Sequence, residues 1–429
     1  MEIKRVKYLN KLKENMHNGL VKIITGMRRC GKSYLLNNIF YNFLLSIKVP
    51  EDHIIKFAFD SADDLKQIGE DFVELAKNKQ FVDPKKFLVY INNKIIDNNR
   101  YYLLLDEIQN LSSFEIVLIS FLKKENIDIY VTGSNSKFLS SDVATEFAGR
   151  GYEIHVFPLS FREFYSALGG EKNEAYKQYS MFGGLPQIVS LKTDKQKRDY
   201  LSTLVKEVYL KDIIVHNNLK NNSNIEELLK VIASCVGFFT NPSKLESTFK
   251  SVKKESIWRE TIENYISYFV NSFLISKAFR NDVKGKKYIY PPYKLYFEDI
   301  GLHNAILNFR QYEPTHIMEN IVYNEIKYHD FGVDVGMIKA RKKINDKIEW
   351  KNYEIDFIAL DGSKKIYIQS AYSISSEEKW LKEIHPFNKL KDAFKKIIIV
   401  KDPIVLNQNS NGYLVSNLFD FLLSNDILR

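Results

Sequence analysis

Short apolar runs alternate with stretches of helical periodicity along the first 160 residues. Residues 33–45 place their apolar side chains on one broad helical face, and Pro84 begins a second helix that runs towards Ile96. This alternation predicts a parallel sheet wound with helices. The predicted strands, each rich in β-branched or aromatic residues and closed by a polar residue or glycine, are residues 20–25, 53–59, 101–105 and 127–132.

The pattern changes after Phe157. The next 60 or so residues favour a helical connector, interrupted most strongly by the turn Gly183-Gly184-Leu185-Pro186. Three predicted helices then precede a β-hairpin around residues 284–287, which is the order of a winged helix. A helix over 319–329 and strands near 333–340, 353–360, 365–369 and 397–400 follow. The expected fold is multidomain α/β, with domains at 1–160, 161–223, 224–300 and 301–429.

The composition is that of a folded globular protein. Of the 429 residues, 45% are hydrophobic and 27% charged, and the net charge of +9 permits an acidic partner without requiring one. Two cysteines far apart, Cys30 and Cys235, make neither a disulfide framework nor a metal knot, so a reducing cytoplasm is expected. The N-terminus carries no signal-peptide pattern, and no apolar stretch approaches the roughly 18 residues of a spanning helix, so no membrane partner is expected.

The segment Gly26–Ser33, GMRRCGKS, matches the phosphate-binding loop G-x-x-x-x-G-K-[ST] between a predicted strand and a helix. The glycines let successive backbone N–H groups point at phosphate oxygens, next to the positive end of the helix. Lys32 is expected to reach the β and γ phosphates of ATP, and Ser33 to bind Mg²⁺. The expected nucleotide contacts are Gly26, Met27, Arg28, Arg29, Cys30, Gly31, Lys32, Ser33 and Tyr34. Arg5 and Tyr8 are weaker candidates for lining the base, and guanine is not excluded.

Further chemistry-bearing residues follow the next strands. Asp106 ends an apolar strand where it can hold the Mg²⁺ water shell, and Glu107 beside it is placed to polarise an attacking water. Ser134, after the strand at 127–132, either reaches the γ-phosphate or belongs to an ordinary turn. Arg150, on a glycine-flanked turn, either neutralises phosphate charge, from its own or a neighbouring subunit, or is a surface arginine. The oligomeric state is therefore open.

Together these segments resemble prokaryotic P-loop ATPases of the AAA type that carry a C-terminal domain of unknown function (DUF4143). The resemblance implies an AAA-like core that uses ATP and Mg²⁺, a winged-helix middle and a C-terminal fold related to restriction-type nucleases, without implying a substrate. It spans nearly the whole chain and rests on Gly26–Ser33, on segments 104–109 and 132–136, on Ala148-Gly149-Arg150, and on segments 158–164, 183–186 and 211–214.

The restriction-type pattern is only partly filled. Glu319 and Asp356 match its first two acids, but Gln369 stands where an acid is expected and Ala371 where a lysine would activate water. Losing an anionic oxygen weakens a site for a hard cation, so a degenerate, non-cleaving fold is predicted. Lys364 and Lys379 are the nearby lysines that could substitute.

A basic set falls in the winged-helix region. It could follow a DNA backbone, but a solvated basic face explains it equally well, and winged helices also bind proteins. His316 precedes Glu319 by three residues and is favoured as an ordinary histidine over a metal ligand. The basic set and its interleaved tyrosines are Lys253, Lys254, Lys284, Lys286, Lys287, Tyr288 and Tyr290.

These observations leave three functional hypotheses. The first is a Mg²⁺-dependent ATPase whose turnover rearranges the C-terminal regions, and the second is a slow nucleotide-dependent binding switch for a protein or nucleic acid. The third is an ATP-regulated nuclease, which Gln369 and Ala371 disfavour.

Overall fold

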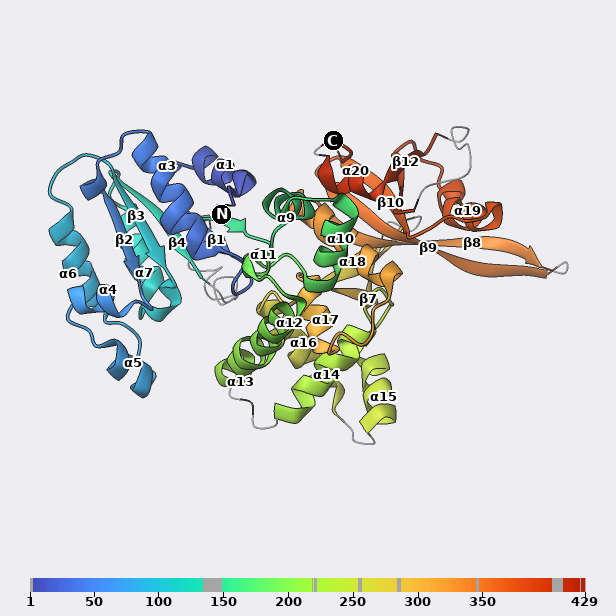
Figure 1. Ribbon diagram of the computed structural model, residues 1–429, viewed down its shortest axis with the longest axis horizontal. Helices are drawn as coiled ribbons and strands as arrows, with labels where there is room; N and C mark the ends of the chain where they lie inside the picture. The colour runs from blue at the N-terminus through green and yellow to red at the C-terminus, as the bar shows by residue number, and fades with distance from the viewer. Residues whose placement is uncertain are drawn as a thin grey trace. The chain divides into compact units, whose positions relative to one another are not determined.

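The computed structural model divides the chain into two compact units, residues 1–158 with 271–273 and residues 159–270 with 274–429 (Figure 1). The structure describes residues 3–133, 149–217, 219, 222–253, 257–283, 287–344, 347–402, 412–424 and 426–428. Each unit is described by itself.

The described part of the first unit contains a parallel sheet in the order β2-β3-β4-β1-β5. Because β4 lies between β1 and β3, the carboxyl ends of these strands meet at one edge, where ligands bind in open α/β sheets. The strands are β1 (Val21–Thr25), β2 (Ile54–Ala58), β3 (Tyr101–Asp106), β4 (Ile127–Thr132) and β5 (Gly151–His155).

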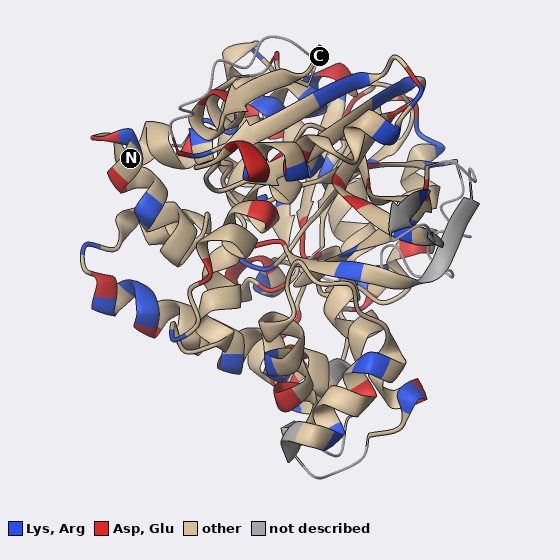
Figure 2. Cartoon of the chain, turned by 90° about the vertical axis from the view of Figure 1, so that its right-hand side faces the viewer, with Lys and Arg blue, Asp and Glu red and all other residues tan. Residues whose placement is uncertain are grey.

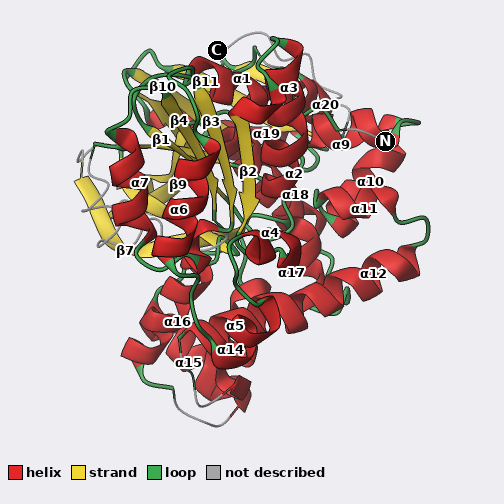
Figure 3. Cartoon of the chain, turned by 90° about the vertical axis from the view of Figure 1, so that its left-hand side faces the viewer, coloured by secondary structure: helices red, strands yellow, loops and turns green. Residues whose placement is uncertain are grey.

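Helices cover both faces of this sheet (Figure 3). On one face, Phe87 of α6 and Phe121 of α7 join the strand side chains in one buried core. On the other, Phe40 of η1 packs on Tyr130 with ring centroids 4.4 Å apart. The helices of this unit are α1 (Val6–Glu14), α2 (Lys32–Tyr34), the π-helical η1 (Leu35–Phe40), α3 (Tyr41–Ser46), α4 (Ala62–Gln67), α5 (Phe72–Asn78), α6 (Pro84–Lys94) and α7 (Phe114–Leu122), with short 3₁₀ turns η2 (Glu51–His53) and η3 (Ile108–Asn110).

Apolar runs predicted the inner strands well because a parallel sheet covered by helices buries both faces of its strands. The predicted strands at 20–25, 53–59, 101–105 and 127–132 correspond to β1, β2, β3 and β4 within one residue at either end. The sequence analysis missed β5. Only Ile154 of this strand is fully buried, so β5 carries no continuous apolar run.

The second unit begins with helices, as predicted for residues 161–223. Its turn at Gly183-Gly184-Leu185-Pro186 is a packing device, because a Cβ on Gly184 would lie 2.3 Å from the Leu159 carbonyl oxygen. The Gly184 N–H also donates to Asp299 Oδ2 at the start of α17 (2.8 Å). The first helices are α9 (Phe161–Leu168), α10 (Lys172–Phe182), α11 (Pro186–Ser190), α12 (Asp194–Thr203), the π-helical η5 (Leu204–Leu210) and α13 (Lys211–His216).

The expected winged-helix order is present over residues 222–297. The helices α14 (Asn222–Ser234), α15 (Pro242–Lys253) and α16 (Arg259–Asn271) precede the antiparallel pair β6 (Ile275–Asp282) and β7 (Lys287–Phe297). Lys254, Lys284 and Lys286 lie outside the described residues, and so do the side chains of Lys253, Lys287, Tyr288 and Tyr290. The basic set is therefore still a prediction, as is the winged helix.

In the described part of the second unit, β6 and β7 belong to a larger sheet of order β12-β11-β10-β9-β8-β6-β7. β6 pairs in parallel with β8, so one sheet crosses the expected domain boundary at residue 300. The chain runs α18, β8, β9, β10, α19, β11, with β8–β9–β10 antiparallel and β10–β11 parallel.

The remaining elements complete this unit. The predicted strands at 333–340, 353–360, 365–369 and 397–400 fall inside β8, β9, β10 and β11. These elements are α17 (Ile300–Ile306), α18 (Pro314–Tyr328), β8 (Gly332–Ile344), β9 (Lys347–Asp361), β10 (Lys364–Ala371), α19 (Glu377–Ile384), the 3₁₀ turn η6 (Phe387–Lys389), β11 (Lys395–Val400), β12 (Leu414–Asn417) and α20 (Leu418–Leu423).

Candidate functional site

The phosphate loop connects the end of β1 to the start of α2. Gly26 has φ 135°, and a Cβ there would lie 2.2 Å from the Val156 carbonyl oxygen, so only glycine fits this bend. Gly31, also at positive φ, precedes the first helical residue Lys32. The sequence motif therefore folds into the strand–loop–helix arrangement that it requires.

Inside the loop, Lys32 is 5% exposed and its Nζ donates to the carbonyl oxygens of Gly26 (2.9 Å) and Met27 (3.0 Å). The side chains of Met27 and Cys30 are fully buried and fill the space beneath the loop, whereas Tyr34 is 44% exposed. A buried ammonium among backbone dipoles, next to the N-terminus of a helix, suits an anionic ligand.

Asp106, at the end of β3, joins three elements. Its Oδ1 accepts from Ser33 Oγ (3.1 Å) and from the Thr132 hydroxyl, and its Oδ2 accepts from Asn37 Nδ2 (3.2 Å). Burial raises the pKa of Asp106, although the Thr132 and Ser33 hydroxyls oppose this shift. The sheet thus brings together Ser33 and Asp106, which the sequence predicted as the Mg²⁺ ligands.

Glu107 follows Asp106 in a left-handed conformation with φ 50°. Its N–H donates to Thr132 Oγ1 (3.1 Å), and its carboxylate accepts from Gln109 Nε2. Asp60, just after β2, lies close enough to both acids for their charges to affect its pKa. Desolvation, followed by the charges of Glu107 and Asp106, raises the pKa of Asp60, and Arg28 of the loop lowers it.

Sequence reasoning missed Asn37, Thr132 and Asp60. Asp60 carried a readable signal, since it follows a predicted strand just as Asp106 does. Thr132 and Asn37 carried none, because a threonine closing a strand and an asparagine within a helix are both common. Their role follows only from the strand order, which places β4 between β1 and β3.

The two other expected catalytic residues are Ser134 and Arg150. Ser134 is outside the described residues. Arg150 is exposed at the amino-terminal edge of the sheet, where its carbonyl oxygen accepts from Val21 N (2.9 Å). All of β1 separates it from the loop, roughly 17 Å for five residues of strand. Arg150 therefore does not reach the loop of its own chain.

Arg5 and Tyr8 hold α1 against the segment after β5. The Tyr8 hydroxyl accepts from Phe157 N (3.0 Å), and the Arg5 guanidinium donates to the Phe157 carbonyl oxygen. Tyr8 is fully buried and Arg5 is 4% exposed. These contacts give both residues a structural role. Their predicted role in lining the nucleotide base stays a prediction.

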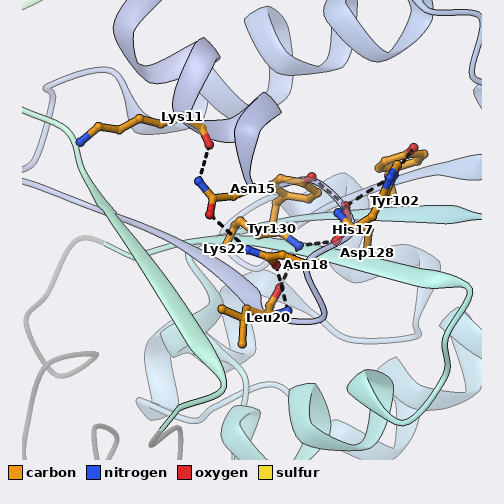
Figure 4. Close-up of polar contacts among 9 residues, drawn as sticks. All are labelled: Lys11, Asn15, His17, Asn18, Leu20, Lys22, Tyr102, Asp128 and Tyr130. Carbon is orange, nitrogen blue, oxygen red and sulfur yellow. Dashed lines mark hydrogen bonds and ion pairs between the residues drawn. The ribbon is translucent and has the colours of Figure 1, made fainter.

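A buried polar network lies at the amino-terminal edge of the same sheet (Figure 4). Lys22 and Asp128 form an ion pair, and Tyr130 and the His17 N–H donate to Asp128 Oδ2 (2.8 and 3.1 Å). Burial lowers the pKa of Lys22, and the negative charge of Asp128 offsets only part of this shift. The His17 ring also bonds the Tyr102 hydroxyl (2.8 Å). These bonds join the turn after α1 to β1, β3 and β4.

In the second unit, Glu319 of α18 lies in a buried ionic cluster. Lys294 of β7 is 2% exposed and contacts Glu319 Oε1 (2.9 Å) and Glu354 Oε1 (2.6 Å), and Tyr296 donates to Glu319 (2.6 Å). Burial alone would raise the pKa of Glu319, but Lys294, His316 and Tyr296 leave that pKa lowered. Lys294 is a lysine that the sequence analysis did not consider.

Asp356 and Gln369 lie at the rim of this cluster. Asp356 Oδ2 accepts from Ser370 N (2.8 Å), and burial raises the pKa of Asp356 well above its usual range, with Glu319 adding to the effect. Gln369 accepts from Asp356 N (2.8 Å) and donates to Glu383 (3.4 Å). A carboxylate could not do both, so Gln369 fits a structural role.

The two lysines suggested as substitutes lie at the start of β10 and in α19. Lys364 begins β10, and Lys379 Nζ donates to Ser373 Oγ (3.2 Å). Among the described residues, no group of three or more His, Cys, Asp or Glu side chains could hold a metal ion. The His316 ring packs on Phe238 at 4.5 Å, as expected for an ordinary histidine.

Family models match two parts of the chain. Residues 18–165 match an AAA domain, and residues 173–313 match a domain of unknown function, DUF8612. The first match, together with the loop geometry, supports an AAA-type P-loop ATPase domain that binds nucleotide. The DUF4143 assignment of the C-terminal region is still a prediction.

Two similar proteins span most of this chain. An uncharacterized protein of Haemophilus influenzae is 29% identical over 403 residues, covering 92% of this chain and 93% of its own length. The uncharacterized protein MJ1544 of Methanocaldococcus jannaschii is 26% identical over 414 residues, covering 92% and 83%.

Solved structures with weaker similarity include AMPPCP-bound DnaA from Aquifex aeolicus, 16% identical over 62% of this chain and 88% of that one, with a TM-score of 0.32. Cdc6p from Pyrobaculum aerophilum is 13% identical over 74% and 94%, with a TM-score of 0.33. In the described part of this chain, no helix is both long and apolar enough to cross a membrane.

Proposed function

We propose that this protein is a Mg²⁺-dependent ATPase whose turnover rearranges its C-terminal unit. The loop amides and Lys32 bind the phosphates, and Glu107 orients the attacking water and accepts its proton. The Thr132 hydroxyl donates to Asp106 and accepts from the Glu107 N–H, so it fixes the positions of both residues beside the loop. Arg150 acts from a neighbouring subunit to neutralise phosphate charge.

The observation that carries this proposal is the hydrogen bond between Ser33 Oγ and Asp106 Oδ1 (3.1 Å), which joins residues 73 positions apart in the sequence. It places a hydroxyl and a carboxylate, both hard oxygen donors, beside the loop that holds Lys32. This donor set fits Mg²⁺. When bound, Mg²⁺ would neutralise the charge of the β and γ phosphates.

The C-terminal unit supports a degenerate nuclease-like fold. The order α18–β8–β9–β10–α19–β11, with Glu319 and Asp356 adjacent, is consistent with the restriction-type resemblance. However, the Lys294 ammonium lies between Glu319 and Glu354, where its charge already balances the acids that a metal ion would need. Cleavage is therefore not part of the proposal.

Steady-state ATP hydrolysis with Mg²⁺ tests the proposal on the intact chain, Lys32→Ala and Glu107→Gln. Lys32→Ala should lose nucleotide binding and hydrolysis together. Glu107→Gln should keep binding and lose at least about 100-fold in kcat, because only the water-activating group is removed. Lys195→Ala, an exposed residue of α12, is the matched control and should keep full activity.

The slow-switch hypothesis predicts a different result. Nucleotide would bind through Lys32, but turnover would stay at background in every condition, with or without DNA or a protein partner. That result would refute the ATPase proposal and leave nucleotide occupancy as the signal.

A further inference from the structure

The strands β8 and β9 continue as a two-stranded ribbon beyond the other strands of their sheet (Figure 1). Their pairing runs from Ile338↔Tyr353 to Ile344↔Lys347, after the last contacts of β8 with β6 and outside those of β9 with β10. At its base, Ile338 and Tyr353 pack in the apolar core of the unit, whereas Lys339, Arg341, Trp350 and Lys351 beyond them are exposed. An exposed, regular pair of strands at the edge of a core invites a functional explanation.

This ribbon is strongly basic. Residues 338–353 contain six lysines or arginines and only two acids. Over the rest of the described chain, basic and acidic residues are interspersed (Figure 2, blue and red). Among the side chains that the structure describes, the register puts Lys339 and Arg341 on one face and Lys351 on the other, all exposed. Cations therefore line both faces of the ribbon.

An aromatic residue lies among these cations. Trp350, directly opposite Arg341, is 57% exposed. Lys339 Nζ and Arg341 Cζ lie 5.3 and 5.0 Å from its ring centroid. These contacts hold the exposed ring and both cations on one face, so that apolar and positive groups are presented together.

We propose that the β8–β9 ribbon binds double-stranded DNA in its major groove. A two-stranded ribbon fits the major groove of B-form DNA, whose walls carry phosphates on both sides, and cations on both faces would meet both walls. An acidic protein surface would be contacted by one face only. The deep, narrow major groove of A-form RNA does not admit a ribbon. The residues of this surface belong neither to the phosphate loop nor to the basic set of the winged-helix region.

Fluorescence anisotropy with a labelled 24-base-pair duplex, measured on the full chain between 50 and 200 mM salt, tests this proposal. The double variant Lys339→Glu/Arg341→Glu should bind at least about tenfold more weakly, and the slope of log affinity against log salt should fall by about two, one per lost phosphate contact. Trp350→Phe should reduce any quenching of tryptophan fluorescence by DNA, since Trp350 is one of only three tryptophans in the chain.

The matched control is Lys195→Glu/Arg198→Glu, which makes the same charge change at exposed positions of α12. Its DNA affinity should stay within about threefold of the unmodified chain. The proposal is overturned if the chain does not bind the duplex, if both double variants lose affinity equally, or if the ribbon variant is unaffected. Tighter binding of single-stranded DNA or RNA through the same residues would also overturn it. Because the ribbon is exposed, both variants should unfold at the same temperature as the unmodified chain.

Discussion

At the scale of single residues, Lys294 determines what the acidic cluster of the second unit can do. Burial lowers the pKa of Lys294, but the charges of Glu319 and Glu354 more than compensate and leave that pKa raised. A buried ammonium with two carboxylate partners satisfies charges that would otherwise be costly to bury. The cluster is therefore understood as structural.

Lys294→Met should destabilise the protein by about 3–5 kcal/mol at pH 7, because it leaves Glu319 buried without its cation. Urea unfolding measures this loss. The double variant Lys294→Met/Glu319→Gln should recover most of it, since the unpaired charge is then gone.

Plasmid DNA incubated with the unmodified protein, Mg²⁺ or Mn²⁺ and ATP should stay intact. Cleavage that Asp356→Ala abolishes would show that the cluster is catalytic after all.

At the scale of elements, the glycine pair after α10 allows a close contact with α17. Asp299, which is 2% exposed, accepts from Gly184 N (2.8 Å) and caps α17 through Leu302 N (3.0 Å). Burial raises the pKa of Asp299 to about 6, although these N–H groups oppose the shift. One carboxyl thus connects a turn to a helix start 115 residues away.

This raised pKa predicts a pH dependence of stability. Between its ordinary value of 3.8 and about 6, Asp299 holds its proton in the folded state and loses it in the unfolded state. The folded state then binds more protons, so the contribution of Asp299 is full below pH 4 and is lost as pH rises through 6. The size is up to about 3 kcal/mol.

Denaturant unfolding of the unmodified chain and Asp299→Asn from pH 3.5 to 7 measures this contribution. Asp299→Asn should show a decline smaller by up to about 3 kcal/mol, because an amide does not titrate. Asp194→Asn, at an exposed position of α12, is the control and should keep the full decline. Parallel curves for the unmodified chain and Asp299→Asn would refute the assignment.

At the scale of the whole molecule, the parallel sheet separates Arg150 from the phosphate loop. All five strands point the same way in the described part of the first unit, so Gly26 follows β1 at one edge and Arg150 precedes β5 at the other. If Arg150 acts on phosphate, it must therefore do so at the loop of another copy of the chain. The proposed ATPase is therefore expected to assemble.

Mixing two inactive variants tests this arrangement. Arg150→Ala should bind ATP normally but hydrolyse it at least about tenfold more slowly. Adding it to Glu107→Gln should restore part of the activity, because some interfaces then pair an intact Glu107 with an intact Arg150. Mass measurement with and without ATP reports assembly directly. An active Arg150→Ala, or a mixture no more active than its components, would contradict the proposal.

Local patterns were sufficient to predict much of this protein. The phosphate loop could be read because all its determinants lie within eight residues, and β1–β4 because buried parallel strands are continuously apolar. Ser33 and Asp106 were predicted together because parallel strands deliver their ends to one edge. β5 lacked the apolar signal, and Lys294 looked like any strand lysine.

The sequence by itself thus determined the phosphate loop, the acid pair Asp106 and Glu107, and the strands β1–β4 and β8–β11 in outline. The tertiary structure alone decided which residues complete the sites. Strand order brought Thr132 to Asp106, and the sheet that extends past residue 300 brought Lys294 to Glu319. These contacts depend on which strands become neighbours. Which strands become neighbours depends on the packing of the whole sheet. A local stretch of sequence carries no information about that packing.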